Sequence, residues 1–268
     1  MFQYATARAL SISCKTNLML DIGEFDTYSL RSFELDKYNV QASVIHPNSY
    51  LRLLFKKLRL YKIFRFYHIE KKLQYDKKLK TLGSFSYLEG YFQCEKYFSN
   101  IREEILSEFS IIKNITKYAR EIEKEILSHN CSISLHIRRS DYALDEKTNN
   151  IHGLCDLSYY EKAISLMSEK FNNPKYFIFS DDIKWAENNL KNKDAIYVKN
   201  IEERNPHEDI YLMSLCKHNI IANSSFSWWG AWLNENNNKI VVSPKKWFKD
   251  EELLGQSGDI ACQSWIKL

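Results

Sequence analysis

Residues 132–142 combine the pattern of a β-strand with an abrupt cluster of charge, and this stretch constrains the fold more than any other. Apolar and polar side chains alternate over residues 132–137, which is the period of a strand. The alternation stops at two adjacent arginines, Arg138 and Arg139. Because ligands of open α/β sheets bind at the carboxyl ends of strands, we predict a strand that presents two guanidinium groups at such an end.

The rest of the second half alternates strand patterns with helix patterns. Strands are predicted at 132–137, 175–179, 195–199, 219–222 and 239–243. Helices are predicted at 158–170, 183–190, 206–218 and 227–233, with a polar loop over 143–156. A capping box from Ser158 to Glu161 is expected to open the first helix, and Trp228, Trp229 and Trp232 are expected in the core. This alternation indicates an α/β fold with a parallel, doubly wound sheet.

Three of these strands end in polar clusters, which a parallel sheet would bring to one edge. The clusters are His136, Arg138, Arg139 and Asp141; then Ser180, Asp181 and Asp182; then Asn223, Ser224 and Ser225, followed by Phe226. Two guanidinium groups suit a diphosphate, and a turn that enters a helix offers N–H groups to an anion. Taken singly, the clusters also fit an ion pair, a Mg²⁺ site of paired carboxylates, and a helix cap.

The first half of the chain gives weaker patterns. We predict a helix over 1–13, a short buried strand over 17–21, loops with short strands over 21–47 and a basic helical segment over 48–80. A helical stretch over 97–128 contains the expected domain boundary, near residues 115–118. Aromatic rings between residues 81 and 98 can stack on a sugar, although buried packing is their commoner use.

The segment over 48–80 carries many lysines and arginines against two acidic residues, Glu70 and Asp76. A basic amphipathic helix can lie on an anionic membrane surface, so peripheral membrane contact is one interpretation. The other is a solvated face above an ordinary core stripe.

Composition excludes several classes of protein. A net charge of +4 over 268 residues permits an anionic substrate and gives no reason to expect nucleic acid as a partner. The six cysteines are scattered without a C-x-x-C pair, which argues against a zinc site and a disulfide framework. No apolar run approaches the ~20 residues of a spanning helix. We expect a cytoplasmic protein, peripheral on the inner face of the membrane if the basic segment binds lipid.

Several motifs together resemble one enzyme family. The sequence His136-Ile-Arg138-Arg139-Ser-Asp141 resembles the H-x-R-R-x-D motif of GDP-fucose-dependent fucosyltransferases. With residues 179–185, residues 223–230 and the opening residues 1–10, it is similar to the bacterial family 11 glycosyltransferases, the α-1,2-fucosyltransferases. The order and spacing of these blocks extend the resemblance over essentially the whole chain.

The resemblance implies a GT-B-like fold, in which two Rossmann-like domains face each other across a cleft. Residues 1–115 would form the acceptor-side domain and residues 116–268 the GDP-sugar-binding domain. The implied reaction is inverting transfer of L-fucose from GDP-L-fucose to the 2-hydroxyl of a β-galactoside, in a glycan such as a surface polysaccharide. GDP-L-fucose is a substrate in this reaction, and no cofactor or metal is expected.

The resemblance also implies roles for the polar clusters. Arg138 is the principal catalytic candidate, with Arg139 beside it and Asp141 orienting the pair. Donor binding is expected from His136, from Ser180, and from Asp181 or Asp182 at guanine N–H groups or ribose hydroxyls. Asn223, Ser224, Ser225 and Phe226 are expected at the diphosphate. The candidates for a general base are Asp141 and His152.

One part of the family pattern does not appear in this sequence. The family's Gly-x-Gly-Asn-Gln loop precedes the residues that match Met1 to Tyr4. A start codon assigned too late and a truncated gene product would both account for this difference. The alternative function is therefore a catalytically impaired remnant that binds nucleotide-sugar, and a third is a glycosyltransferase with another nucleotide donor.

Overall fold

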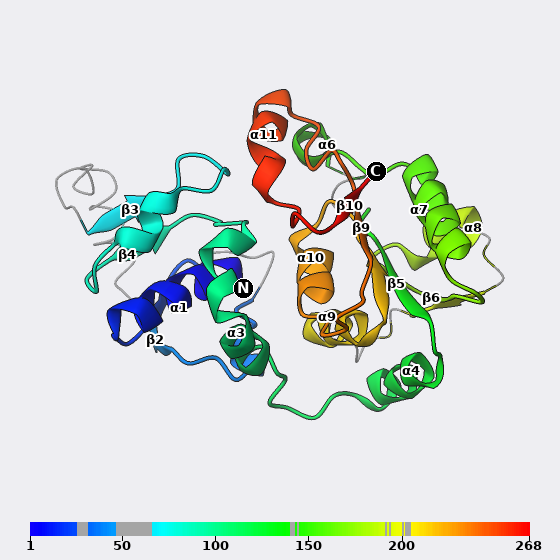
Figure 1. The fold of residues 1–268 in the computed structure, drawn as a ribbon, viewed down its shortest axis with the longest axis horizontal. Helices are drawn as coiled ribbons and strands as arrows, with labels where there is room; N and C mark the ends of the chain where they lie inside the picture. Colours follow the sequence, from blue (N-terminus) through cyan, green and yellow to red (C-terminus); the bar gives the residue numbers. More distant parts are fainter. Residues whose placement is uncertain are drawn as a thin grey trace. The chain divides into compact units, whose positions relative to one another are not determined.

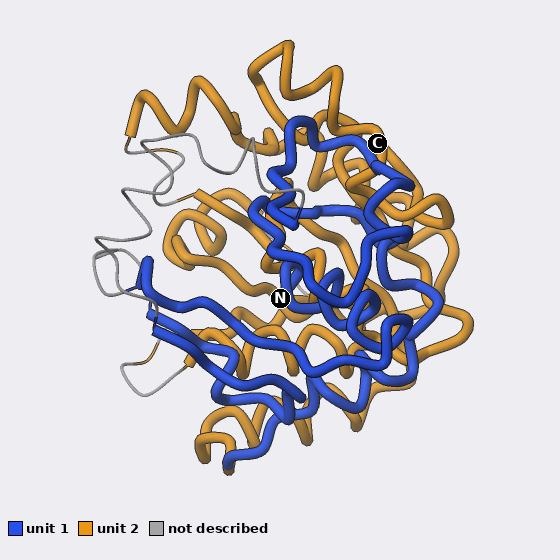
Figure 2. The backbone as a smooth tube through the Cα atoms, turned by 90° about the vertical axis from the view of Figure 1, so that its left-hand side faces the viewer, with its two compact units in different colours: residues 1–113 blue, residues 114–268 orange. Residues whose placement is uncertain are grey.

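The computed structural model describes residues 1–25, 32–46, 66–139, 143, 145–190, 192, 194–199, 201 and 205–268. By its internal contacts the chain divides into two compact units, residues 1–113 and 114–268 (Figure 2). The sequence-based boundary was placed after residue 115. Each unit contains helices and parallel strands, so the chain is an α/β protein, as predicted.

Unit 2 (residues 114–268) is built on a six-stranded parallel sheet. Its strands are β5 Ser132–Ile137, β6 Lys175–Ser180, β7 Ala195–Tyr197, β8 His218–Ile220, β9 Val241–Ser243 and β10 Ile266–Lys267. Their spatial order is β10-β9-β8-β5-β6-β7, and every neighbouring pair is parallel. The chain therefore starts in the middle of the sheet, runs outward to β7, and returns to β8 on the other side of β5.

This strand order is that of a doubly wound, dinucleotide-binding sheet, so the predicted topology is confirmed for unit 2. The direction of winding reverses between β5 and β8, where Ile133, Ser134 and Leu135 pair in register with the three residues of β8. Ligands of such sheets bind outside the carboxyl ends of the strands at this reversal. A ligand site is therefore expected where β5 and β8 end.

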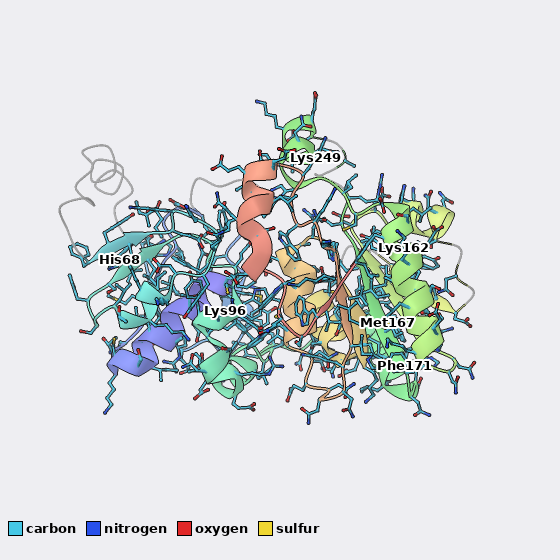
Figure 3. All side chains as sticks on the ribbon, turned by 45° about the horizontal axis from the view of Figure 1, so that its top comes forward. His68, Lys96, Lys162, Met167, Phe171 and Lys249 are labelled. Carbon is cyan, nitrogen blue, oxygen red and sulfur yellow. The ribbon has the colours of Figure 1, made fainter. Side chains whose placement is uncertain are left out.

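Helices cover both faces of this sheet (Figure 1). The described helices of unit 2 are α4 Lys117–Ser128, α6 Glu146–His152, α7 Leu157–Lys170, α8 Ile183–Asn189, α9 Pro206–Leu215, α10 Ser225–Trp232, α11 Glu251–Gln256 and the 3-10 helix η6 Ser257–Asp259. Figure 1 shows α7 and α8 on one side of β5 and β6, and α9 and α10 on the other. Met167 of α7 belongs to the core between that helix and the sheet (Figure 3).

The central strand β5 is buried along its whole length. Its aliphatic residues, Ile133, Leu135 and Ile137, pack with α7 in one core cluster. The serines between them meet polar partners: Asn219 Nδ2 donates to Ser134 Oγ over 2.7 Å, and the Lys217 backbone N–H donates to Ser132 Oγ over 3.2 Å. The alternating residues of β5 therefore lie on two buried faces of the sheet: the aliphatic residues on an apolar face and the serines on a polar face.

Two buried amides connect β8 with the helices on its polar face. The side-chain Nδ2 of Asn219 also donates to Met213 O in α9 over 2.8 Å. Its Oδ1 accepts a hydrogen bond from Asn234 Nδ2 over 2.8 Å, and Asn234 also donates to Cys216 O over 2.6 Å. The segments that follow α9 and α10 are thereby tied to the same strand.

The helix α10 packs closely against α9. A Cβ atom on Gly230 would lie 2.8 Å from the Cβ of Met213, so a larger residue is excluded at this crossing. The three tryptophans of α10 are buried, as predicted for core residues. Trp228 Nε1 donates to Ile260 O over 2.7 Å, which satisfies the one polar group of that ring.

Unit 1 (residues 1–113) contains two separate two-stranded parallel sheets in its described part. Its elements are α1 Phe2–Cys14, β1 Met19–Asp21, β2 Ser43–Ile45, β3 Tyr67–Ile69, β4 Tyr87–Glu89, α3 Arg102–Glu108 and the 3-10 helices η1 Leu35–Lys37, η3 Lys77–Thr81, η4 Glu95–Tyr97 and η5 Ser99–Ile101. The strand β1 pairs with β2, and β3 pairs with β4. The buried Glu108 accepts a hydrogen bond from the Tyr4 hydroxyl and pairs with Arg8 over 2.7 Å, which joins α3 to α1.

Several predictions for unit 1 were wrong. The strand over 17–21 exists as β1, which pairs with β2, but it is not buried as predicted: Met19 is exposed, and the two residues after it are partly exposed. Residues 66–80, predicted as helix, contain β3 and the start of η3. The part of that prediction over residues 48–65 lies outside the described residues.

Three helix boundaries also differ from the prediction. The stretch over 97–128 breaks before Thr116, whose side chain caps α4 by accepting from Ala119 N over 3.2 Å. The predicted loop over 143–156 contains α6. The cap of α7 is Asp156, which accepts from Tyr159 N over 2.8 Å, so the capping box predicted from Ser158 was misplaced.

We expect Asn219→Ala to lower the free energy of unfolding of unit 2 by about 2–3 kcal/mol, because buried polar partners of the amide lose their hydrogen bonds. The exposed Asn237→Ala is the matched control and should change it by less than about 0.5 kcal/mol. Urea unfolding followed by tryptophan fluorescence measures both. Equal midpoints for the two variants would contradict the structural role of the buried amide.

Candidate functional site

Polar residues follow β5, β6 and β8 at the same edge of the sheet in unit 2. The strand β5 lies between the other two, and Ile137 at its end pairs in register with Ser180 at the end of β6. Arg138 and Arg139 therefore emerge beside Asp181 and Asp182. The structure brings these four predicted site residues together.

Asp181 bonds to both arginines. Its Oδ2 lies 2.9 Å from Arg138 Nη1, and its Oδ1 accepts a hydrogen bond from the Arg139 backbone N–H over 2.8 Å. The side chains of Arg138 and Asp181 are 17% and 21% exposed, so this ion pair is partly shielded from water. Asp181 is thus in position to orient Arg138. Asp141, for which that role was predicted, lies outside the described residues.

Asp182 caps α8 and faces the second arginine. Its Oδ1 accepts from Trp185 N over 3.1 Å, and its Oδ2 lies 3.5 Å from Arg139 Nε. The Arg139 guanidinium carbon lies 4.1 Å from the centre of the Trp185 ring. Ser180 Oγ accepts from Asp182 N over 2.9 Å, which holds the turn before α8. We call Arg138, Arg139, Asp181, Asp182 and Trp185 the arginine–carboxylate cluster.

Two predicted donor-binding residues meet beside this cluster. His136 is buried at the end of β5, and its ring lies 5.5 Å from the ring of Phe226, in the first turn of α10. Ser224 caps α10, with its Oγ accepting from Phe226 N over 3.3 Å, and Ser225 is exposed in the first turn. A ring contact thus connects the end of β5 with the first turn of α10, the helix that follows β8.

Asn223 has a structural role in its loop. Its Nδ2 donates to the backbone carbonyls of His152, Gly153 and Trp247, over 2.9, 3.3 and 3.3 Å. The amide therefore joins the turn after α6 to the segment before α11. The base candidate His152 lies near this turn, with its ring 5.4 Å from the ring of Phe248.

Cys155 lies next to the same loop, with its Sγ 3.5 Å from Asn223 Oδ1. Burial raises the pKa of this thiol to about 11. The group therefore stays protonated at neutral pH, which removes the thiolate that nucleophilic catalysis needs.

Carboxylates near the arginines could in principle hold a metal ion. Within the part of the chain that the structure describes, no group of three or more His, Cys, Asp or Glu residues is arranged to do so. Asp181 and Asp182 direct their oxygens to arginines and to backbone N–H groups. Their described contacts are those of residues that position cationic side chains.

The family model of Glycosyl transferase family 11 matches residues 1–268 of this chain. The chain belongs to this family. It is 38% identical to an alpha-1,2-colitosyltransferase of Escherichia coli, with all of this chain and 94% of the relative covered. It is 35% identical to the O-antigen biosynthesis glycosyltransferase WbnK of Escherichia coli, over all of this chain and 96% of the relative.

More distant relatives include a galactoside 2-alpha-L-fucosyltransferase, SEC1 of Bos taurus, which is 25% identical over 56% of this chain and 43% of the relative. Among solved structures, the NodZ alpha-1,6-fucosyltransferase soaked with GDP-fucose gives a TM-score of 0.45 at 14% identity, covering 87% of each chain. POFUT1 in complex with GDP gives a TM-score of 0.42 at 11% identity, covering 90% of this chain and 93% of the other. The chain is thus a family 11 glycosyltransferase related to α-1,2-fucosyltransferases.

Sequence reasoning missed Trp185 as part of the site and gave Asp181 no role toward the arginines. The signal for Asp181 was available, because two neighbouring parallel strands ended in charges of opposite sign. The contact of Trp185 with Arg139 depends on how α8 leaves the strand, which the sequence pattern does not specify.

We expect Asp181→Ala to destabilise unit 2 more than Asp182→Ala does. Loss of Asp181 removes the ion pair with the largely buried Arg138 and the hydrogen bond from the Arg139 backbone N–H, at a cost of about 2 kcal/mol, whereas loss of Asp182 removes a helix cap, at about 1 kcal/mol. Chemical unfolding of the two variants measures the difference. The reverse order would show that Asp181 is not the main support of Arg138.

Proposed function

We propose that this glycosyltransferase transfers L-fucose from GDP-L-fucose to the 2-hydroxyl of a β-galactoside, with inversion at the sugar carbon. The observation that carries the proposal is the position of Arg138. It stands at the carboxyl end of the central strand, beside the reversal of winding, with Asp181 bound to its guanidinium group. A diphosphate bound at this edge would lie where such sheets hold nucleotides.

The proposed mechanism rests on the charge that develops when the bond between sugar and nucleotide breaks. The sugar gains oxocarbenium character, and the β-phosphate gains negative charge. A guanidinium group already oriented by a carboxylate stabilises that phosphate more in the transition state than in the ground state, which lowers the barrier. Backbone N–H groups at the start of α10 would add partial positive charge to the same region.

Two donor sugars fit the relatives. The similarity to galactoside fucosyltransferases favours L-fucose, and the 38% identity to an alpha-1,2-colitosyltransferase favours colitose, the 3-deoxy form of that sugar. A site that hydrogen-bonds the 3-hydroxyl rejects the analogue that lacks it by a factor of about 10⁴, whereas a site without that bond discriminates weakly. The ratio of kcat/KM for GDP-L-fucose and GDP-colitose therefore separates the two donors.

The acceptor proposed is a β-galactoside within a surface polysaccharide. Its support is the similarity to an O-antigen biosynthesis glycosyltransferase and to galactoside fucosyltransferases. Unit 1, residues 1–113, is proposed to hold this acceptor, and unit 2 the nucleotide.

We expect Arg138→Ala to lower kcat for transfer from GDP-L-fucose to lactose by at least about 10²-fold, the usual loss when a transition-state donor is removed. The matched control is Arg120→Ala, an exposed arginine of α4 that should change kcat by less than about twofold. Radiolabelled or coupled transfer assays measure both variants.

Calorimetry with GDP, UDP and CDP accompanies that assay. Turnover unchanged in Arg138→Ala would remove the proposed mechanism. Binding of GDP without transfer by the wild type would favour the nucleotide-sugar-binding remnant instead. Binding of UDP or CDP in place of GDP would indicate another donor.

Peripheral contact with an anionic membrane through residues 48–80 is proposed as well. In the described part of unit 1, lysines 71, 72, 77, 78 and 80 are exposed. Phe85 and Tyr91, which follow that segment in the chain, are 79% and 68% exposed, so most of their surface is accessible to an interface. Lysines attract anionic lipid by about 1 kcal/mol each near the surface, and aromatic rings favour the headgroup region. For the part of the chain that is described, no helix is long and apolar enough to span a bilayer.

We expect the wild type to float with vesicles that contain phosphatidylglycerol and not with neutral vesicles. Replacing lysines 71, 72, 77 and 78 by alanine should lower the bound fraction at least about tenfold. Replacing lysines 124, 162, 170 and 184, four exposed lysines of unit 2, makes the same change in net charge and should leave the binding unchanged. Equal losses in both variants, or equal binding to neutral vesicles, would contradict contact through this segment.

A further inference from the structure

The two arginines of the arginine–carboxylate cluster have different surroundings. Arg138 meets the carboxylate of Asp181, whereas the Arg139 guanidinium lies over the ring of Trp185. We infer that Trp185 is a positioning residue, which fixes Arg139 on α8 and so leaves Arg138 as the guanidinium group that meets the diphosphate. This inference rests on the proposed function, because it divides the two arginines between tasks in that reaction.

The geometry of α8 places the ring under the guanidinium group. Asp182 precedes the helix and accepts from the Trp185 backbone N–H over 3.1 Å, so the same residue caps the helix and sets the start of its first turn. The distance of 4.1 Å from the Arg139 guanidinium carbon to the ring centre is well within the range of a cation–π contact. The ring and the carboxylate thus approach one guanidinium group from a single helical turn.

The ring is the stronger of these two holds. The Asp182 carboxylate is 40% exposed and lies 3.5 Å from Arg139 Nε, and exposed pairs of this kind contribute at most a small part of the stability. The Trp185 ring is partly buried and packs against the core cluster formed by α7 and the sheet. Because the core fixes the ring, the guanidinium group stacks on a rigid surface.

Fixing Arg139 also constrains its neighbour. The backbone N–H of Arg139 donates to Asp181 Oδ1, and the other oxygen of the same carboxylate binds Arg138. Arg139 is therefore held at both its backbone and its side chain, directly after Arg138. A loop restrained in this way presents Arg138 in one orientation, which costs no reorganisation during the reaction.

The experiment is a double-mutant cycle on the full chain. We expect Trp185→Leu and Arg139→Gln each to lower kcat/KM for GDP-L-fucose about tenfold. The double variant should also lose about tenfold rather than a hundredfold, because Trp185 acts through Arg139. Trp185→Phe, which keeps an aromatic face, should lose only about threefold, mainly as a raised KM.

The matched control is Phe171→Leu. Phe171 follows α7 (Figure 3) and packs against the same core cluster as Trp185. The substitution therefore removes an aromatic ring from that core and leaves the ring beneath Arg139 in place. Its kcat/KM should stay within about twofold of the wild type. Additive losses in the double variant, or equal losses in Trp185→Phe and Trp185→Leu, would overturn the inference.

The urea unfolding midpoint of each variant in the cycle provides a readout that does not depend on activity. We expect the second substitution to shift the midpoint less than it does alone, because the contact is already lost. Additive shifts would count against the contact whether or not the chain turns over GDP-L-fucose. A wild type that binds no GDP but shows coupled midpoints would instead contradict the proposed function and leave the contact supported.

Discussion

The candidate site depends on the contacts of the Asp181 carboxylate with Arg138 and Arg139. Asp181 stands directly after β6 and bonds to the backbone of one arginine and the side chain of the other, both of which follow β5. β5 and β6 pair in register up to Ile137 and Ser180. Because Asp181 follows Ser180 and the two arginines follow Ile137, this backbone pairing places Arg138 and Arg139 where the Asp181 carboxylate can bond to both.

One short segment, residues 180–185, supplies most of the groups that fix the geometry of the site. Between Ser180 and Trp185 the chain supplies a hydroxyl that holds the turn, two carboxylates, a helix cap and an aromatic face. All of them act on the pair of arginines or on the turn that supports it. Fixed charges of this kind favour a reaction in which negative charge appears at a known place, because the protein needs no rearrangement to meet it. Family 11 membership is consistent with such a reaction, because a glycosyltransferase breaks the bond between the donor sugar and its leaving group.

The sequence predicted unit 2 better than unit 1, for physical reasons. Strands such as β5 and β6 lie at the centre of a sheet, and their side chains must satisfy burial on both faces, which leaves a strong pattern. The described strands of unit 1 each pair with one neighbour and contain no fully buried residue, so burial leaves little pattern in their sequence. The strand β10, with two residues, and the helix α11, with six, were missed because neither is long enough to show a period.

Within the site, the strand ends were predictable, but the partners of each side chain were not. The sequence indicated which strands end in charge, but the pairing of Arg138 with Asp181 became visible only in the structure. The sequence also could not show that Asn223 bonds to three backbone carbonyls, because those carbonyls come from segments far away in the chain. Roles that depend on distant backbone groups leave no trace in local residue patterns.

The serines of β5 have a consequence for how the sheet assembles. Ser134 is matched to an amide of β8 on one face, while the aliphatic residues beside it are matched to α7 on the other. A slip of one residue would turn every side chain to the opposite face, burying hydroxyls against hydrocarbon and leaving the amide without its acceptor. The strand therefore pairs with its neighbours in a single register. That register also fixes where along the edge of the sheet the two following arginines lie.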